Sequence, residues 1–337
     1  MSRYLVTSRM KIFVLAGLCL ILVVAFISSI IVGQTPISMG QAVGSFLNYN
    51  ESVTEHVVVR NDRLPRVVIG AVIGACLAIS GALMQALTRN PLASPSIFGI
   101  NTGAIFFVVV GVVFFSISSL QHLMWFAFLG ATIAALLVYF LGSLGRDGLT
   151  PIKIVLAGAA ISALFQSYTQ AILVMNEAGL QDVLFWLAGS ISGRTLDMLL
   201  PVLPFMIGSV IVVLFMGRAI NLLITGDDIA KGMGQKVWLV KVTMGVIVVL
   251  LAGSSVAVVG SVGFIGLVIP HIARAFTGND YRWLLPFAAI LGAVLLLMAD
   301  VVARLLIMPQ EVPIGVMTAI IGAPFFIYIA KRGVTKL

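Results

Sequence analysis

The chain has 337 residues, of which 61% are hydrophobic and only 9% charged, and its mean hydropathy is +1.16. A water-soluble domain carries about 25% charged residues, so this composition excludes an ordinary soluble protein. The formal net charge of +8 does not indicate nucleic-acid binding, because the basic residues stand in short segments between apolar runs. The repeated long apolar runs predict an all-α protein that crosses a membrane many times.

About ten transmembrane helices follow from the apolar runs, because a helix needs about 20 mostly apolar residues to cross a bilayer. The first run follows basic residues but is too long for a signal peptide, so we interpret it as a retained span. The predicted helices are 12–33, 65–88, 92–111, 118–142, 151–175, 196–217, 237–259, 262–277, 283–307 and 312–331.

The distribution of basic residues predicts the orientation of these helices. The polar stretch 34–62 is too hydrophilic to span and is predicted to be an extracytoplasmic loop with a short surface helix. Most of the 20 Lys and Arg residues then fall on the side of the N-terminus, so both termini are predicted to be cytoplasmic. The basic residues predicted to lie outside are Arg60, Arg63, Arg66, Arg194 and Arg304.

Proline and glycine interrupt two of the spans. We predict helix breaks beside a transport pathway at Asn90, Pro91, Pro95, Gly263, Gly266 and Pro270. The first break is predicted at the cytoplasmic end of its span and the second at the outer end, the arrangement that an inverted repeat produces. Helix packing alone is the other interpretation of the glycines, since the pairs Gly70/Gly74 and Gly99/Gly103 have the spacing of closely approaching helices.

Catalytic and metal-binding motifs are missing from the sequence. It has no G-x-x-x-x-G-K-[ST] phosphate loop, no H-E-x-x-H and no cysteine cluster, so we predict neither an enzyme, nor a metal site, nor a cofactor in this chain. Only Asp300 lies clearly within a span, with Arg304 four residues later as a partner on the same helix face. A stand-alone secondary transporter, which would show unpaired intramembrane acids, is therefore a weaker interpretation.

The longest cytoplasmic connection, 218–236, contains the candidate contact with a cytoplasmic partner. Its acidic pair suits the first turn of a short amphipathic helix, and glycines follow that helix. The helix is either a simple turn between spans or a docking knob. The residues assigned to it are Gly226, Asp227, Asp228, Ile229, Ala230, Gly232, Met233 and Gly234.

Several blocks resemble the iron-siderophore and vitamin B12 permease family (FecCD type) of bacterial ABC importers. They follow one another in the family's order over nearly the whole chain, and those at 81–95 and 263–274 are specific. The blocks are RLPR (63–66), GACLAISGALMQALTRNPLASPSIFGINTGA (74–104), GDDIAKGMG (226–234), GSVGFIGLVIPHIARAFTGNDYRWLLP (260–286), GAVLLLMADVVARLL (292–306) and EVPIGVMTAIIGAPFFIYI (311–329).

The resemblance implies a single permease domain over residues 1–337 with the type II ABC importer fold, in a bacterial cell membrane. Its partners would be a second permease chain, two ATPase subunits that hydrolyse ATP, and an extracytoplasmic binding protein. The loop at 226–234 would couple to the ATPase. Arg63, Arg66 and Arg304 would face the binding protein, with local pairing to Asp62, Glu55, Asp300 or Glu311 as the alternative. The implied cargo is a ferric siderophore, with haem or cobalamin as alternatives.

Overall fold

The computed structural model describes residues 7–144, 150–176, 183–184 and 186–334, and its regular structure within these ranges is helical. Six helices are long and apolar enough to cross a membrane, and one bent helix pair adds a seventh. Three shorter apolar helices, Ile100–Phe115, Ile265–Thr277 and Ile314–Tyr328, occupy the positions of the remaining predicted spans. The prediction of a polytopic helical protein with about ten spans is confirmed.

The helices follow one another in chain order with short connections. They are α1 (Ser8–Ile31), α2 (Met39–Leu47), α3 (Thr54–Val58), α4 (Leu64–Thr88), α5 (Ile100–Phe115), α6 (Leu120–Ser143), α7 (Pro151–Met175), α9 (Leu196–Leu199), α10 (Leu203–Phe215), α11 (Gly217–Leu223), α12 (Asp227–Gly232), α13 (Val237–Val248), α14 (Ser254–Val259), α15 (Ile265–Thr277), α16 (Tyr281–Leu306) and α17 (Ile314–Val334). Two π-helical turns, Val59–Arg63 and Val249–Gly253, join α3 to α4 and α13 to α14.

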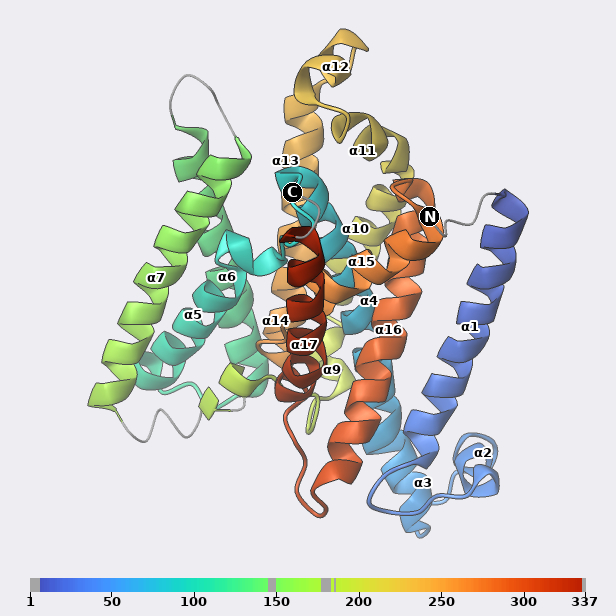
Figure 1. The fold of residues 1–337 in the computed structure, drawn as a ribbon. Helices are drawn as coiled ribbons and strands as arrows, with labels where there is room; N and C mark the ends of the chain where they lie inside the picture. Colours follow the sequence, from blue (N-terminus) through green and yellow to red (C-terminus); the bar gives the residue numbers. More distant parts are fainter. Residues whose placement is uncertain (1–6, 145–149, 177–182, 185, 335–337) are drawn as a thin grey trace.

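The two ends of the helix bundle differ in what they carry (Figure 1). At one end, called here the α12 end, α1 begins and α17 ends. Lys11 at the start of α1 donates a hydrogen bond to the carbonyl of Thr277 there, over 3.3 Å. At the opposite α2 end, the Gln34 amide donates to the carbonyl of Pro309 over 2.6 Å. Because α1 starts and α17 finishes at the same end, the chain crosses an even number of times.

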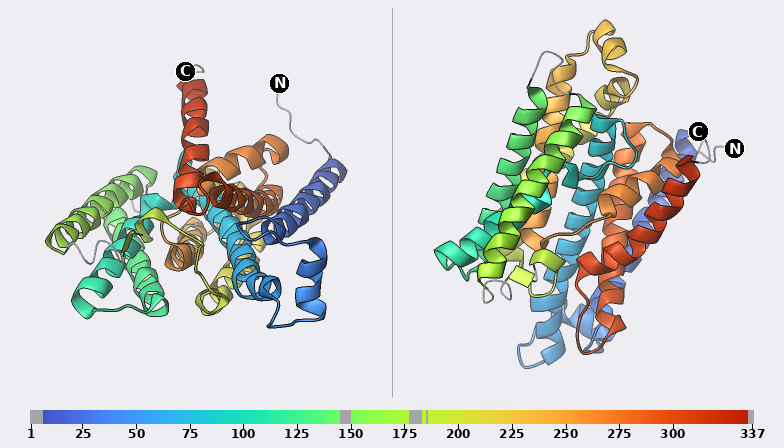
Figure 2. Two further views of the ribbon diagram at one scale, coloured as in Figure 1. Left: turned by 90° about the horizontal axis from the view of Figure 1, so that it is seen from below. Right: turned by 60° about the vertical axis from the view of Figure 1, so that its left-hand side comes forward.

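α4 passes through the middle of the bundle, with α1 on one side and α5, α6 and α7 on the other (Figures 1 and 2). Its most extensive contact is with α16. That contact requires glycine, because a Cβ on Gly74 would lie 2.3 Å from the carbonyl oxygen of Gly292. α5 and α6 meet in the same way at Gly103 and Gly130. Two of the predicted small-residue positions, Gly74 and Gly103, therefore mark real helix crossings.

The third and sixth spans depart from their predicted limits. The third helix starts at Ile100 and not at 92, because Pro95–Phe98 forms a 3₁₀ turn and Gly99 has φ +68°, which ends that turn. The predicted helix 196–217 is divided into α9, α10 and α11, and α11 is bent by 63° from α10 after Phe215. Pro201, Pro204 and Gly217 mark the divisions of the sixth span in the sequence.

The polar stretch 34–62 contains more helix than predicted. The short surface helix is α2, which begins with a capping box in which Ser38 and Gln41 satisfy each other's backbone N–H groups. From Thr54 the chain is already helical and continues through the π-turn into α4, giving one helix from Thr54 to Thr88. Arg63, which lay between the predicted loop and the predicted helix, therefore belongs to the π-turn of this continuous helix, and Arg66 lies in α4 as predicted.

Candidate functional site

The short helix predicted for the long connection at the α12 end is present as α12. Glycine is required on both sides of it, because Gly226 has φ +134° and Gly234 has φ +81°, values that residues with side chains rarely adopt. Ala230 is fully buried, whereas Ile229 and Met233 are 56% and 69% exposed. The helix therefore presents two apolar side chains outward from a tightly specified turn.

Asp227 fastens α12 to the rest of the protein. Its carboxylate is bonded by Arg89, at the end of α4, and by Lys241 on α13, the latter over 2.6 Å. Burial alone would raise the pKa of Asp227, but the hydrogen bond from Lys241 and the charges of Lys241 and Arg89 outweigh it and lower that pKa. Asp228 is fully exposed and has only a loose pairing with Lys231 at 3.9 Å. The two adjacent acids thus have different roles, which the sequence did not distinguish.

A second set of hydrogen bonds ties the same region to α16. Gln235 donates to the carbonyl of Ala219 over 2.8 Å, and Asn221 on α11 donates to Asp280 over 2.7 Å. Hydrogen bonds from Arg282 and Asn221 outweigh burial and lower the pKa of Asp280 to about 2. Hydrogen bonds therefore connect the loop that carries α12, through α11, to the start of α16.

The first predicted break begins where α4 ends. Arg89 has φ +49°, and the side chain of Asn90 accepts the N–H of Leu92 over 2.9 Å, which turns the chain back into the protein. Pro95 then starts the 3₁₀ turn, and it is buried. Arg89 also donates to the carbonyl of Leu223 over 3.2 Å. The break at Asn90–Pro91 is therefore physically joined to the loop that carries α12.

The second predicted break lies deeper than expected. Helix α15 starts at Ile265, and Gly266 packs on the backbone of Gly81 in α4. Gly81 is about 12 Å along the helix from Arg89 at the usual helical rise. The break at Gly263–Gly266 is therefore at the end of α15 that points away from the α12 end, as predicted, but it lies inside the bundle and not at its surface. A Cβ on Gly266 would also lie 3.1 Å from Cδ of Pro95, so the two predicted breaks touch each other.

Pro270 leaves a backbone carbonyl in α15 without its usual helical donor, because proline has no N–H. The carbonyl is that of Gly266, and the buried amide of Gln85 lies 3.4 Å from it. Arg274 in turn donates to the Gln85 side-chain oxygen. Sequence reasoning missed Gln85, although a polar side chain inside an apolar span was the signal for it.

The arginines at the α2 end are buried. Arg63 donates to the carbonyls of Ile30 and Ile31, over 2.8 Å each, and so satisfies the C-terminal end of α1. Arg304 donates to the carbonyls of Ser29 and Val32, over 3.1 Å each. Both side chains therefore cap the same helix end. The pairing of Arg63 with Asp62 or Glu55, which was the alternative for this residue, is not among its hydrogen bonds in the described chain.

Asp300 is the shared partner of the other charged groups. Arg66 binds Asp300 Oδ1 over 2.8 Å and Glu311 over 2.9 Å, while Arg304 binds Asp300 Oδ2 over 2.9 Å. The predicted pairing of Arg304 with Asp300 is confirmed. The side chains of Arg66, Arg304 and Asp300 are 6%, 4% and 2% exposed, so they do not offer free charge to a partner in this structure. A cavity of about 370 Å³ adjoins them, and its lining includes the polar residues Ser190, Ser192 and Glu311.

Comparison with known proteins identifies the family of the chain. The model of the FecCD transport family matches residues 21–332, which include α12, both breaks and the buried arginines. The chain belongs to the FecCD transport family. Membership in the FecCD family makes it a transport permease and not an enzyme, and its apolar helices make it a multi-pass membrane protein.

The FecCD relatives include two permeases from Bacillus subtilis (strain 168). One, named "Probable siderophore transport system permease protein YfiZ", is 55% identical over 95% of this chain and 96% of its own. The other, the Fe(3+)-citrate import system permease protein YfmD, is 41% identical over 97% of this chain and 96% of its own. A solved structure of a transporter assigned to the metal-chelate type of ABC transporters, in an inward-facing conformation, has a TM-score of 0.83 and 29% identity. It covers 96% of this chain and 99% of its own.

Proposed function

We propose that this FecCD permease is the membrane subunit of an ATP-driven importer that moves a ferric siderophore into a bacterial cell. The similarity to YfiZ supports the cargo most directly. Within the described residues, no group of three His, Cys, Asp or Glu side chains could hold a bare metal ion, which also favours an iron that arrives already chelated. In this proposal the α12 end is cytoplasmic and the α2 end faces the binding protein.

The cargo is tested by uptake in a strain that lacks the permease gene and retains its ATPase and binding protein. We expect the restored chain to take up radiolabelled iron from one or more of a hydroxamate, a catecholate and a citrate chelate. Uptake would also be lost if one of the other transporter subunits in the strain were inactive. A strain complemented with YfiZ is therefore the positive control for those subunits. Restored cobalamin or haem uptake with no siderophore-iron uptake would overturn the proposed cargo.

The coupling contact is proposed to be made by the outward side chains of α12 against two ATPase subunits, one under each of two permease chains. Ile229 and Met233 suit this contact because they are exposed and apolar, while Asp227 is occupied inside the chain. Alternating access would follow if the ATPase held α12 differently in its two nucleotide states.

Replacing Ile229 and Met233 with Glu is expected to reduce siderophore uptake at least tenfold while leaving the amount of membrane-inserted protein unchanged. The ATPase should still hydrolyse ATP, but the substrate-loaded binding protein should no longer stimulate it. The matched control is Leu47→Glu, which places the same charge on an exposed apolar position of α2 at the opposite end. Stimulation equal to that of the unmodified chain would contradict the docking assignment.

A further inference from the structure

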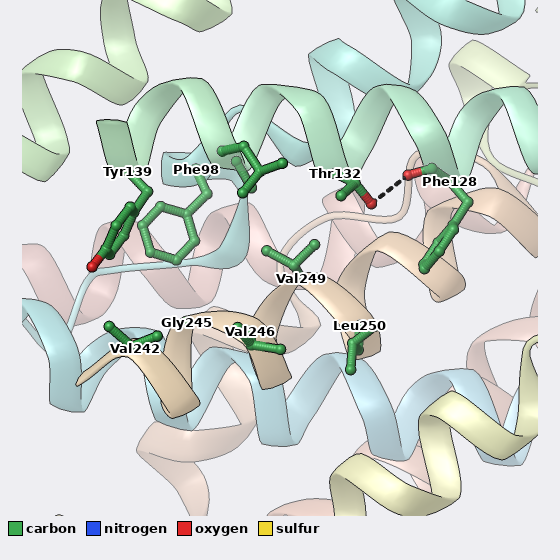
Figure 3. Close-up of a pocket in the computed structure, with 11 residues that line it drawn as sticks. Phe98, Phe128, Thr132, Tyr139, Val242, Gly245, Val246, Val249 and Leu250 are labelled. Carbon is green, nitrogen blue, oxygen red and sulfur yellow. Dashed lines mark hydrogen bonds between the residues drawn. The ribbon is translucent and has the colours of Figure 1, made fainter. Parts of the chain in front are cut away.

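An apolar groove runs between α6 and α13 (Figure 3). Its volume is about 280 Å³, and its walls include Phe128, Leu136, Tyr139, Val246 and Leu250. Thr132 is also in the wall. Its hydroxyl donates to the carbonyl of Phe128 over 2.8 Å, so its hydrogen is already bonded within the protein and an apolar occupant need not accept it. Leu136 and Val246 are 61% and 52% exposed, so the groove opens sideways toward the membrane.

The length of this groove matches one leaflet of a bilayer. Phe128 and Tyr139 stand at its two ends on α6 and are separated by about 16 Å at the usual helical rise. The hydrocarbon core of a bilayer is about 30 Å thick, so one leaflet contributes about 15 Å. The part of a single acyl chain that crosses one leaflet therefore fits the length of the groove. Water is a poor occupant, because the apolar walls offer it no hydrogen bonds.

A charged cavity adjoins the groove at the α12 end. Tyr139 and Val242 line both, so the two spaces are adjacent. The second cavity has a volume of about 460 Å³ and is lined by Lys231, Lys236 and Lys241, with Asp227 as its one carboxylate. Lys241 is partly neutralised by Asp227, whereas Lys231 and Lys236 are exposed.

Trp238 marks the depth at which these two cavities meet. It lines the charged cavity and is 67% exposed. Tryptophan is enriched at the level of the lipid headgroups, where its ring is partly apolar and its N–H remains hydrated. The lysines thus lie at headgroup level, and the groove extends from there into the hydrocarbon.

We propose that this composite site binds one anionic phospholipid, with an acyl chain in the α6–α13 groove and the phosphate between Lys231 and Lys236. Clusters of lysine at the cytoplasmic end of transmembrane helices select anionic headgroups, and the adjoining groove gives this cluster a place for the attached chain. The lipid lies against α13, whose Lys241 holds Asp227 of α12. The lipid is therefore placed to stabilise the position of α12, the helix that we propose contacts the ATPase.

The test measures lipid retained by the full-length permease assembly. The assembly is extracted from the membrane, equilibrated with dioleoyl phosphatidylglycerol or dioleoyl phosphatidylcholine, and weighed by native mass spectrometry. We expect one strongly retained phosphatidylglycerol per permease chain and weaker retention of phosphatidylcholine. Each lysine near the headgroup is worth about a fivefold change in affinity, so Lys231→Gln combined with Lys236→Gln should weaken phosphatidylglycerol binding by about 25-fold.

Two matched controls separate the site from general effects. Gly245→Phe should fill the groove and abolish the retained lipid, because a Cβ at Gly245 meets no atom within 4 Å. Gly208→Phe makes the same change at another open position, on α10, and should retain the lipid. Arg218→Gln removes an exposed charge at the same end outside the cavity and should also have no effect.

Three outcomes would overturn the lipid site. The first is equal retention of the two lipids by the unmodified chain. The second is undiminished phosphatidylglycerol on Gly245→Phe. The third is that Gly245→Phe separates the assembly into single permease chains without changing the lipid per chain, since a second copy of the protein would then be the occupant of the groove.

Discussion

Asp300→Ala should remove most of the assembled protein from the membrane. The Asp300 carboxylate is 2% exposed and lies between the guanidinium groups of Arg66 and Arg304. Its loss would leave Arg304 with only neutral partners and Arg66 with the single carboxylate of Glu311. Removing one partner from a buried ion pair costs about 3–5 kcal/mol, which is a large part of the stability of most proteins. The measurement is the yield and the unfolding temperature of the detergent-extracted chain.

The matched control for this prediction is Asp228→Ala. Asp228 is fully exposed, and its pairing with Lys231 is 3.9 Å long, so its removal should leave the unfolding temperature unchanged. A stable Asp300→Ala chain with the unfolding temperature of the control would mean that the buried charges are compensated in some other way. Asp300→Asn keeps the volume of the side chain and should give an intermediate loss.

The same charged cluster bears on binding-protein docking, which stays a prediction for Arg63, Arg66 and Arg304. Direct docking would make Arg304→Lys bind the partner with nearly unchanged affinity at low salt, because the charge is kept. Exposed charges are screened at about 1 M salt, where the Debye length is about 3 Å. If the arginines act instead by holding α1 and α16 in place, Arg304→Lys should weaken docking equally at both salt concentrations.

Gly81→Ala is expected to reduce both stability and transport strongly, although it adds only one methyl group. The new Cβ would lie 1.9 Å from the carbonyl oxygen of Gly266, so the backbones of α4 and α15 would have to separate. Overpacking of this kind usually costs about 1–3 kcal/mol, and here the displaced atoms belong to backbone that cannot change rotamer. We expect at least a tenfold decrease in siderophore-iron uptake, with a lower unfolding temperature.

The control is the same substitution at Gly208, where a Cβ meets no atom within 4 Å. Alanine is favoured over glycine in a helix by about 1 kcal/mol, so Gly208→Ala should be neutral or stabilising. An equal effect of the two substitutions would show that helix propensity, and not the crossing of α4 with α15, determines the outcome. A normal unfolding temperature with lost uptake would place the crossing in the transport cycle alone.

The sequence predicted the spans well because their signal is local. A run of apolar residues must be helical in a bilayer, so α7 was predicted at its observed limits and α13 to α14 within their combined range. Helix ends near Pro95 and Phe264 were less predictable, because left-handed residues there depend on packing against other helices. Phe264 has φ +65° although no glycine marks that position.

The candidate sites were predictable in part. Glycines and acids around 226–234 identified α12, because the capping pattern lies within nine residues of sequence. That Asp227 is held by Arg89 could not be predicted, since the two residues lie 138 positions apart. Charge counting singled out the arginines predicted to lie outside, but only the fold revealed that Arg63 and Arg304 are buried and cap the end of α1. A charge count registers which side of the membrane a residue occupies and not whether it is buried.

The capping of α1 by Arg304 also sets an order of assembly. Ser29 and Arg304 are separated by 275 positions, and the arginine belongs to one of the last helices to be made. At a synthesis rate of about 5–20 residues per second, roughly 14–55 s pass between the two. During this interval the carbonyls at the end of α1 lack one of their two arginine partners. The α2 end of the first span is therefore completed only when nearly the whole permease has left the ribosome, so a truncated chain cannot form it.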